Sequence, residues 1–269
     1  DASGISHDSF DQAVSMNADG EANLTNEMKA QGIRLQTSVY PAVYYIGFNM
    51  LDSVVGGKSL RAKKLRQAIS IAVDYEEYIS IFMNGRGIAS QSPIPPGIFG
   101  YKAGRDGMNT VVYFWDGKQQ KRNPLSQAQQ LMREAGYPNG IDPATQQSLV
   151  LNYDVTTSGG ADDKARFNWM RKQFAKLGIT LNIRSTQYNR FRDKVRTGNA
   201  QIFSWGWLAD YPDPENFLFL LYGPHGKVKH GGENAANYAS PDFDRLFIKM
   251  KNLPSGPERQ AVIDELLAI

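Results

Sequence analysis

Residues 148–208 alternate between strand-like and helix-like patterns, and no other feature limits the possible fold as strongly. Strand patterns occupy 148–155, 179–183 and 200–207, and amphipathic helical patterns separate them at 167–177 and 186–198. A strand–helix–strand–helix–strand order predicts a parallel sheet with right-handed crossovers, and hence an α/β fold. Ligands of such open sheets bind beyond the carboxyl ends of the strands. Loops 153–160 and 207–213 leave such ends, so we expect a ligand there.

Caps and breakers place the remaining elements. A strand is predicted at 39–49, helices at 65–72, 124–135 and from 257, and a long ordered loop with one short strand at 86–122. Asp74 and Glu77 form a D-x-x-E variant of the capping box and predict a helix start. Thr186 is expected to cap the second helix of the alternation, and Ser240 a later helix that begins with proline.

The stretch SWGWLADYPDPENF at 204–217 contains two aspartates for which the sequence predicts different roles. Asp213 precedes Pro214 and an apolar run, which is the pattern of an N-cap followed by proline at the first helical position. Asp210 is not placed to cap that helix. From the residues alone, Asp210 is either a ligand-binding carboxylate or a turn aspartate bonded to its own backbone. Trp207 is likewise either a binding-site aromatic or part of the core.

Composition excludes several functions and leaves others open. The chain of 269 residues has no cysteine, so disulfides, thiol nucleophiles and thiolate metal sites are excluded, and its net charge of +3 gives no strong case for nucleic acid. Neither a zinc-protease nor a nucleophile-elbow motif is present. His225 and His230 share a glycine-rich loop, where loop polarity is the simpler explanation than a metal. A hydrolase that uses an unrecognised carboxylate pair remains an alternative.

Several stretches, taken in order and spacing, resemble the C-terminal lobe of the family 5 extracellular solute-binding proteins, the oligopeptide- and dipeptide-binding proteins of ABC importers. They are YYIGFN (44–49), KLRQAISIAVDYEEYI (64–79), GRGIASQSPIPPG (85–97), AQQLMREAGYPNG (128–140), WGWLADYPDPENF (205–217) and ANYASPDFDRL (236–246). The resemblance implies an α/β, periplasmic-binding-protein-like (type II) lobe with a mainly parallel sheet flanked by helices. Residues 1–269 are expected to form this single lobe, truncated at both ends. Residues 1–48 would be a hinge-proximal segment and 49–269 the main body.

The resemblance also implies a binding site without catalytic residues, metal or cofactor. Asp210 matches the aspartate that binds the α-ammonium group of the peptide in that family. The other expected ligand-binding residues are Trp207, Tyr211, Tyr188, Gly206, Asn49 and Tyr153. Loop 153–160 lacks the arginine with which dipeptide-specific members hold the carboxylate of the ligand. A fixed dipeptide length is therefore not expected, and a longer peptide or a non-peptide amine remains open.

The implied function is capture of a solute by closure of two lobes and its delivery to a membrane ABC permease. The partners would be a peptide or small solute and that permease, with no nucleic acid, and the protein would be a monomer. It would reside in the periplasm, or outside the cell as a membrane-anchored lipoprotein. A metal- or haem-binding member of the same architecture is a further alternative. Because one lobe presents half of a cleft, we expect this chain alone to bind ligand weakly.

Overall fold

The computed structural model describes residues 5, 9–16 and 22–269, and these form two compact units. The first unit comprises residues up to 40 together with 74–90, and the second comprises 41–73 together with 91–269. Residues 1–4, 6–8 and 17–21 of the predicted hinge-proximal segment lie outside the described residues. The predicted segments 1–48 and 49–269 differ from these units, because residues 41–48 belong to the second unit and residues 74–90 to the first.

The first unit is built from short elements around a small apolar core. Its elements are α1 (Phe10–Ala13), β1 (Val14–Met16), β2 (Ala22–Leu24), α2 (Asn26–Ala30) and α4 (Tyr75–Phe82), with β1 and β2 antiparallel. Phe10, Val14 and Leu24 form the buried cluster. Asp74 caps α4 as predicted, because its Oδ1 accepts a hydrogen bond of 3.0 Å from the backbone N–H of Glu77.

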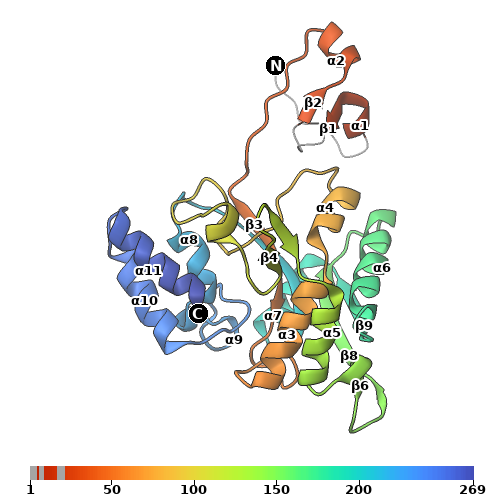
Figure 1. Cartoon of the computed structure of the whole chain (residues 1–269), viewed down its shortest axis with the longest axis vertical. Coiled ribbons are helices and arrows are strands. Elements are labelled where there is room, and N and C mark those ends of the chain that lie inside the picture. Colours follow the sequence, from red (N-terminus) through yellow and green to blue (C-terminus); the bar gives the residue numbers. More distant parts are fainter. Residues whose placement is uncertain (1–4, 6–8, 17–21) are drawn as a thin grey trace. The chain divides into compact units, whose positions relative to one another are not determined.

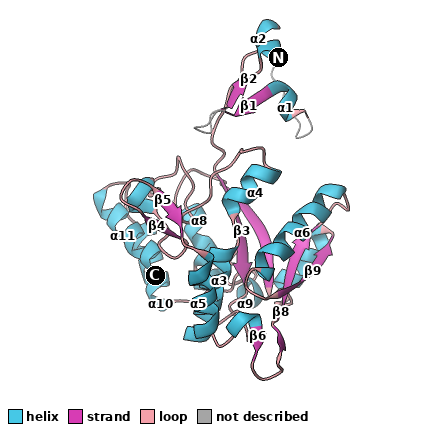
Figure 2. Ribbon diagram, turned by 45° about the vertical axis from the view of Figure 1, so that its right-hand side comes forward, coloured by secondary structure: helices cyan, strands magenta, loops and turns pink. Residues whose placement is uncertain are grey.

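The second unit contains a four-stranded sheet in the order β3-β10-β8-β9 (Figure 2). The strands are β3 (Ala42–Phe48), β8 (Val150–Thr156), β9 (Thr180–Thr186) and β10 (Ile202–Leu208). β8 runs parallel to both β9 and β10, whereas β3 pairs antiparallel with β10. The carboxyl ends of β8, β9 and β10 therefore share one edge of the sheet with the amino end of β3, where Ala42 lies opposite Leu208. The predicted, mostly parallel sheet is confirmed.

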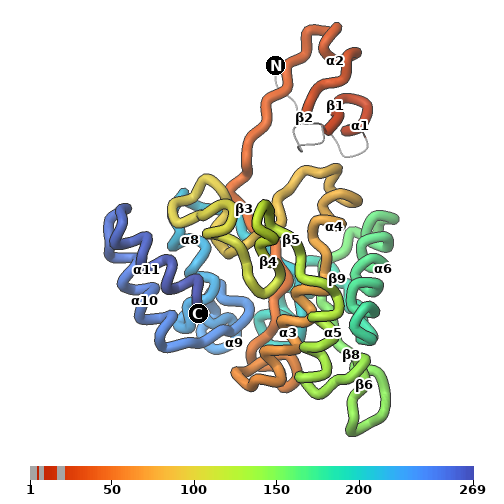
Figure 3. Tube along the Cα trace, in the orientation of Figure 1, coloured from red at the N-terminus to blue at the C-terminus, as the bar shows by residue number. Residues whose placement is uncertain are grey.

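Some helices pack against the sheet and others lie beside it (Figure 1). They are α3 (Leu60–Ala72), α5 (Leu125–Glu134), α6 (Ala161–Ala175), α7 (Tyr188–Arg196), α8 (Glu215–Leu218), α9 (Lys227–His230), α10 (Pro241–Lys251) and α11 (Pro257–Ala268). α3 and α5 lie side by side (Figure 3). α7 packs Phe191 and Val195 against Phe203 of β10, and α10 and α11 form a second core cluster with Phe217 of α8.

The predictions for the long segment 86–122 and for the two helix caps agree with the structure only in part. The segment contains a hairpin of β4 (Tyr113–Trp115) and β5 (Gln120–Arg122), and two further short strands, β6 (Ile141–Asp142) and β7 (Gln147–Ser148), follow α5. The Ser240 cap is confirmed, since its Oγ accepts from the N–H of Phe243. The Thr186 cap is wrong: β9 continues through Thr186, and α7 begins after Gln187 without a side-chain cap.

A buried ionic cluster ties α7 to the sheet. Asp154 of β8 is fully buried, and its carboxylate accepts hydrogen bonds from Arg184 of β9 and Lys194 of α7. The Arg184 Nε–Asp154 Oδ2 distance is 3.1 Å and the Lys194 Nζ–Asp154 Oδ1 distance is 2.9 Å. A buried carboxylate is stable only when it is paired in this way. The cluster therefore links α7 to β8 and β9.

Candidate ligand-binding site

Residues 209–214 form a loop beyond the carboxyl end of β10, where the sheet topology places a ligand. The loop contains Pro212 and Pro214, which restrict its backbone. The N–H of Ala209 donates to the carbonyl of Pro41, at a distance of 2.9 Å. The loop is thus attached to the start of β3 as well as to the end of β10.

Asp213 is committed to the structure of this loop. Its oxygens receive a bidentate ion pair from the buried Arg259 of α11, with N–O distances of 2.7 and 2.8 Å. Its Oδ1 also accepts from the N–H of Glu215 at 2.9 Å, as an aspartate before a helix is expected to do. Burial raises the pKa of the Asp213 carboxyl, but the hydrogen bonds from Arg259 and Glu215 outweigh burial and lower the pKa below its usual range.

Asp210 differs from Asp213 because its carboxylate is free. The residue is exposed, and in the described part of the chain its side chain accepts no hydrogen bond and forms no ion pair. Its backbone N–H donates to Asn216 Oδ1 at 2.8 Å. The turn-aspartate alternative requires a bond from this carboxylate to its own backbone, and the loop contains none. An exposed, unpaired carboxylate at this edge is available to a cation.

Trp207 and Tyr211 lie on either side of Asp210 in the sequence; Trp207 is partly buried, whereas Tyr211 is 44% exposed. The indole Nε1–H of Trp207 donates to Asn216 Oδ1 at 3.1 Å, and its ring meets Phe219 edge-to-face with centroids 5.1 Å apart. Burial raises the pKa of the Tyr211 hydroxyl, while a hydrogen bond from Asn216 opposes this rise. Asn216, which sequence reasoning did not single out, thus accepts hydrogen bonds from both Trp207 and the backbone of Asp210. Trp207 serves both the core and the loop.

Gly206 in β10 makes room for an aromatic ring of the neighbouring strand. A Cβ atom at this position would lie 2.5 Å from Tyr44 Cδ1, and Tyr44 lies opposite Gly206 in the β3–β10 register. Tyr44 is 78% exposed. It therefore presents a large aromatic surface near the ligand edge, and the sequence pattern alone did not identify it.

Tyr188 shares this edge of the sheet but not the loop of Asp210. It is the exposed first residue of α7, directly beyond the carboxyl end of β9, and the guanidinium of Arg192 lies 5.8 Å from its ring centroid. In the strand order, β8 separates β9 from β10. Tyr188 therefore lies two strands away from Asp210 along the same edge.

Asn49 and Tyr153 are buried and lie apart from the loop of Asp210. Asn49 follows β3 at the opposite edge of the sheet from Asp210, because β3 is antiparallel to β10. It is 3% exposed, and its amide donates to the carbonyls of Gly198 and Ala200. Tyr153 is 4% exposed inside β8, which continues to Thr156. Both residues are buried in this structure, and a contact of either with a ligand stays a prediction.

The loop after β8 is closed by a carboxylate of the protein itself. Asp163 Oδ2 accepts from the Thr157 hydroxyl and the Ser158 N–H, both at 2.7 Å, and from the Gly159 N–H at 3.1 Å. The hydrogen bond from Thr157, aided by those from Ser158 and Gly159, lowers the pKa of Asp163. This loop has no arginine, and its own carboxylate occupies the donors with which it would hold an anion.

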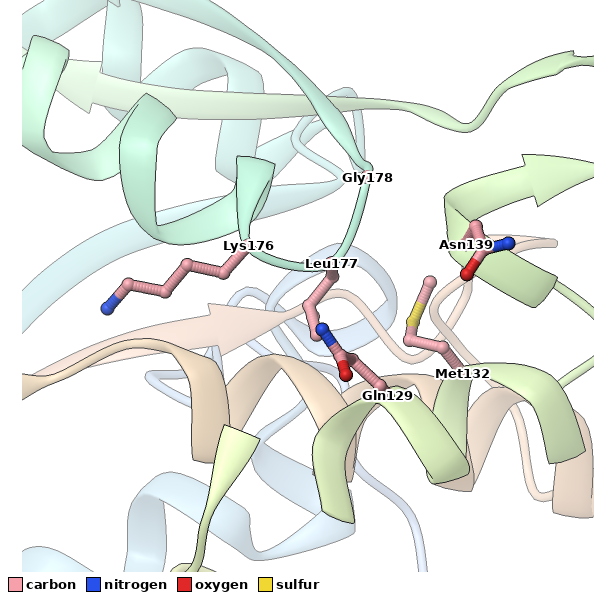
Figure 4. Close-up of a pocket in the computed structure, with 6 residues that line it drawn as sticks. All are labelled: Gln129, Met132, Asn139, Lys176, Leu177 and Gly178. Carbon is pink, nitrogen blue, oxygen red and sulfur yellow. The ribbon is translucent and has the colours of Figure 1, made fainter. Parts of the chain in front are cut away.

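Each of the two units contains a cavity in its described residues, and neither cavity is lined by residues of the 209–214 loop. One, of about 130 Å³, is lined by Gln129 and Met132 of α5, by Asn139 and by 176–178, which precede the amino end of β9 (Figure 4). The other, of about 450 Å³, lies within the first unit between 10–16 and 80–85. Neither contains a predicted site residue.

Metal and membrane signals are also absent from the described residues. No group of three or more potential metal-ligating side chains occurs among them. His225 packs its ring against Phe219 and Tyr222, with centroids 5.8 and 5.0 Å apart. Within the same residues, every helix is too short or too polar to cross a bilayer.

Comparison with known proteins identifies the family. Residues 7–229 match the family described as "Bacterial extracellular solute-binding proteins, family 5 Middle", so the chain belongs to this family. Heme-binding protein A of Haemophilus influenzae is 28% identical over 221 residues, which cover 81% of this chain and 35% of that protein. Oligopeptide-binding protein OppA of Bacillus subtilis is 24% identical over 205 residues, or 76% of this chain and 33% of that protein. The chain spans about a third of the length of these relatives.

A solved structure shares the fold. The periplasmic binding protein DppA of Helicobacter pylori, in complex with the peptide STSA, superposes with a TM-score of 0.66 at 22% identity. The match covers 85% of this chain and 39% of that protein. The predicted periplasmic-binding-protein-like (type II) lobe fold is confirmed.

Proposed function

We propose that the intact protein is the substrate-binding component of an ABC importer and captures a peptide, or a similar amine-bearing solute, outside the cytoplasmic membrane. In this proposal two lobes close around the ligand and deliver it to a membrane permease. Closure is driven only as far as the ligand binds the closed form better than the open form. The protein acts as a monomer and catalyses no reaction.

The free carboxylate of Asp210 carries this proposal. It lies beyond the carboxyl end of a parallel strand, and no cation of the described residues neutralises it. An ammonium group that meets it in a closed cleft gains a charge-assisted hydrogen bond in a medium of reduced dielectric constant. Trp207, Tyr211 and Tyr188 would add aromatic surface along the same edge, and Gly206 with Tyr44 would complete it.

The same charge argues against haem as the ligand, and the pairing of Asp213 argues against a hydrolase. Haem carries two propionate carboxylates, which a lone exposed aspartate repels, so the name of the Haemophilus relative does not decide the ligand here. A hydrolase would need a second carboxylate near Asp210, but Asp213, the next one in the loop, is bound to Arg259. The closed loop at 157–160 further disfavours a ligand carboxylate beside β8, in agreement with a ligand longer than a dipeptide.

Calorimetric titration of the full-length protein with the tetrapeptide Ser-Thr-Ser-Ala and its N-acetylated form tests the proposal. Loss of one partner of a desolvated charge pair costs about 2–5 kcal/mol, and partial exposure places Asp210 at the lower end, or roughly 30-fold in affinity. Asp210→Asn is expected to lose this factor for the free peptide only. Asp242→Asn, which removes an exposed charge on α10, is the matched control and should change nothing.

Native mass spectrometry of the same protein, purified without refolding, reports any captured solute by its mass. A peptide-like mass that disappears in Asp210→Asn supports the proposal. A retained porphyrin, or equal binding of the free and acetylated peptides, would contradict it.

A further inference from the structure

Asn216 is the most deeply buried polar group next to the proposed binding loop. It is the second residue of α8 and 3% exposed. Its Oδ1 accepts from the indole N–H of Trp207 at 3.1 Å and from the backbone N–H of Asp210 at 2.8 Å. One carboxamide thus joins Trp207 at the end of β10 to Asp210 in the loop, two residues that the proposed function assigns to the ligand.

These bonds leave the carboxamide little freedom. A carbonyl oxygen has two lone pairs, and here two donors occupy them. Burial makes each bond expensive to lose, because a buried polar group without a partner costs about 1–3 kcal/mol. The side chain does not cap its own helix, whose first residues are bonded to Asp213 and Pro214. Its interactions are therefore directed at the loop and not at α8.

The loop is consequently held from both sides of Asp210. Asn216 fixes the backbone of Asp210, and Arg259 fixes Asp213 three residues later. The backbone N–H of Asn216 closes the ring by donating to the carbonyl of Asp213 at 3.0 Å. These bonds hold the backbone at Asp210 in place, and its side chain is exposed to solvent.

We infer that Asn216 is a positioning residue for ligand binding, which acts through Asp210 and Trp207 and does not touch the ligand. The inference rests on the proposed function, in which Asp210 binds a cation. A loop already fixed in its binding arrangement avoids the entropy of ordering it when the ligand arrives. Loss of the carboxamide would let the loop move and would spread the Asp210 carboxylate over many positions.

A double-mutant cycle in the full-length protein, with Ser-Thr-Ser-Ala as the titrant, tests this role. Asn216→Ala is expected to weaken binding at least about 10-fold. In the Asp210→Asn background, where the anchor is already gone, the same substitution should weaken binding less than about threefold. The indole ¹H–¹⁵N resonance of Trp207 should shift upfield in Asn216→Ala because its acceptor is lost.

Asn234 provides the matched control. It is fully buried, and its carboxamide bonds Tyr222 and Tyr238 instead of the loop. Asn234→Ala should lower stability by as much as Asn216→Ala, yet keep affinity within about threefold and leave the Trp207 resonance in place. Asn216→Ser, which keeps a hydroxyl acceptor, replaces Asn216→Ala if the latter does not fold, and the same coupling is required of it.

The outcomes separate the two claims. If Asp210→Asn weakens binding, and Asn216→Ala weakens it by the same factor in the Asp210→Asn background as in the wild type, the positioning role is wrong and the proposed anchor stands. If Asp210→Asn binds like the wild type, the anchor fails and the positioning role fails with it.

Discussion

Replacement of Lys194 by methionine tests whether the buried cluster at Asp154 holds α7 on the sheet. Methionine keeps most of the side-chain stem and removes the ammonium group that lies 2.9 Å from Asp154 Oδ1. At an effective dielectric constant of about 20, two unit charges at this separation attract by roughly 6 kcal/mol. Two observations reduce this number: the Lys194 side chain is 27% exposed, and Arg184 still pairs with Asp154 in the variant.

We therefore expect Lys194→Met to lower the free energy of unfolding by about 3 kcal/mol, the range observed when one partner of a buried ion pair is removed. Urea-induced unfolding followed by far-UV circular dichroism measures this loss. The control is Arg196→Met on the same helix. Arg196 pairs with Asp193, and both side chains are more than 60% exposed, so its loss should stay below about 1 kcal/mol.

Equal losses in Lys194→Met and Arg196→Met would refute the reasoning. In that case the ion pair between Lys194 and the fully buried carboxylate of Asp154 would add no more stability than an exposed pair. Packing of Phe191 and Val195 alone would then hold α7. A larger loss in Lys194→Met with an unchanged urea slope would support the electrostatic account.

Two further predictions concern the sheet and the binding loop. Gly47→Ala should lower the free energy of unfolding by about 2–3 kcal/mol, because its Cβ would lie 2.3 Å from the ring of the fully buried Phe203. Gly206→Ala should lower it by less than about 1 kcal/mol, because the exposed Tyr44 can move aside. Urea unfolding of both variants measures the two losses, and equal losses would contradict the argument. Asp213 has a lowered pKa in the folded state, so its contribution is fully present above the unfolded pKa of about 4 and is lost as the pH falls through the lower folded value. The stability difference between wild type and Asp213→Asn should accordingly be largest near pH 6 and shrink below about pH 4, and a difference independent of pH would show that the Arg259 pair does not stabilise the loop.

Local signals predicted much of the fold. The helix signals at Asp74, at Ser240 and at the glycine after α5 depend only on residues close together in the sequence. The strand–helix alternation implied the parallel order of β8, β9 and β10. Thr186 was wrong for a local reason as well, because β-branched residues prefer strands and the strand continued through it.

The candidate site was predictable only where it follows directly from strand direction. Asp210 was placed at the carboxyl edge because β10 is parallel to its neighbour. Asn49 lies at the opposite edge because β3 runs antiparallel to β10, which nothing in the sequence shows, and Tyr153 lies inside β8, within the predicted strand 148–155.

The pairings that hold the site were not predictable. Asn216 with Trp207, Asp163 with the loop after β8, and Asp213 with Arg259 each depend on where chain segments meet in space. The motif WGWLADYPDPENF contained Asn216, but its sequence does not show which of its polar groups face inward.

The antiparallel position of β3 also has a consequence for how the polypeptide acquires its structure. β3 is the first strand of the sheet to leave the ribosome, and its hydrogen-bonding partner β10 is the last. During synthesis an aromatic, β-branched segment must wait for its partner while most of the chain is made, and such exposed segments are prone to mispairing. Contacts this distant in sequence also slow folding. The final, rate-limiting event of refolding should therefore be the docking of residues 42–48 onto a preassembled three-stranded core.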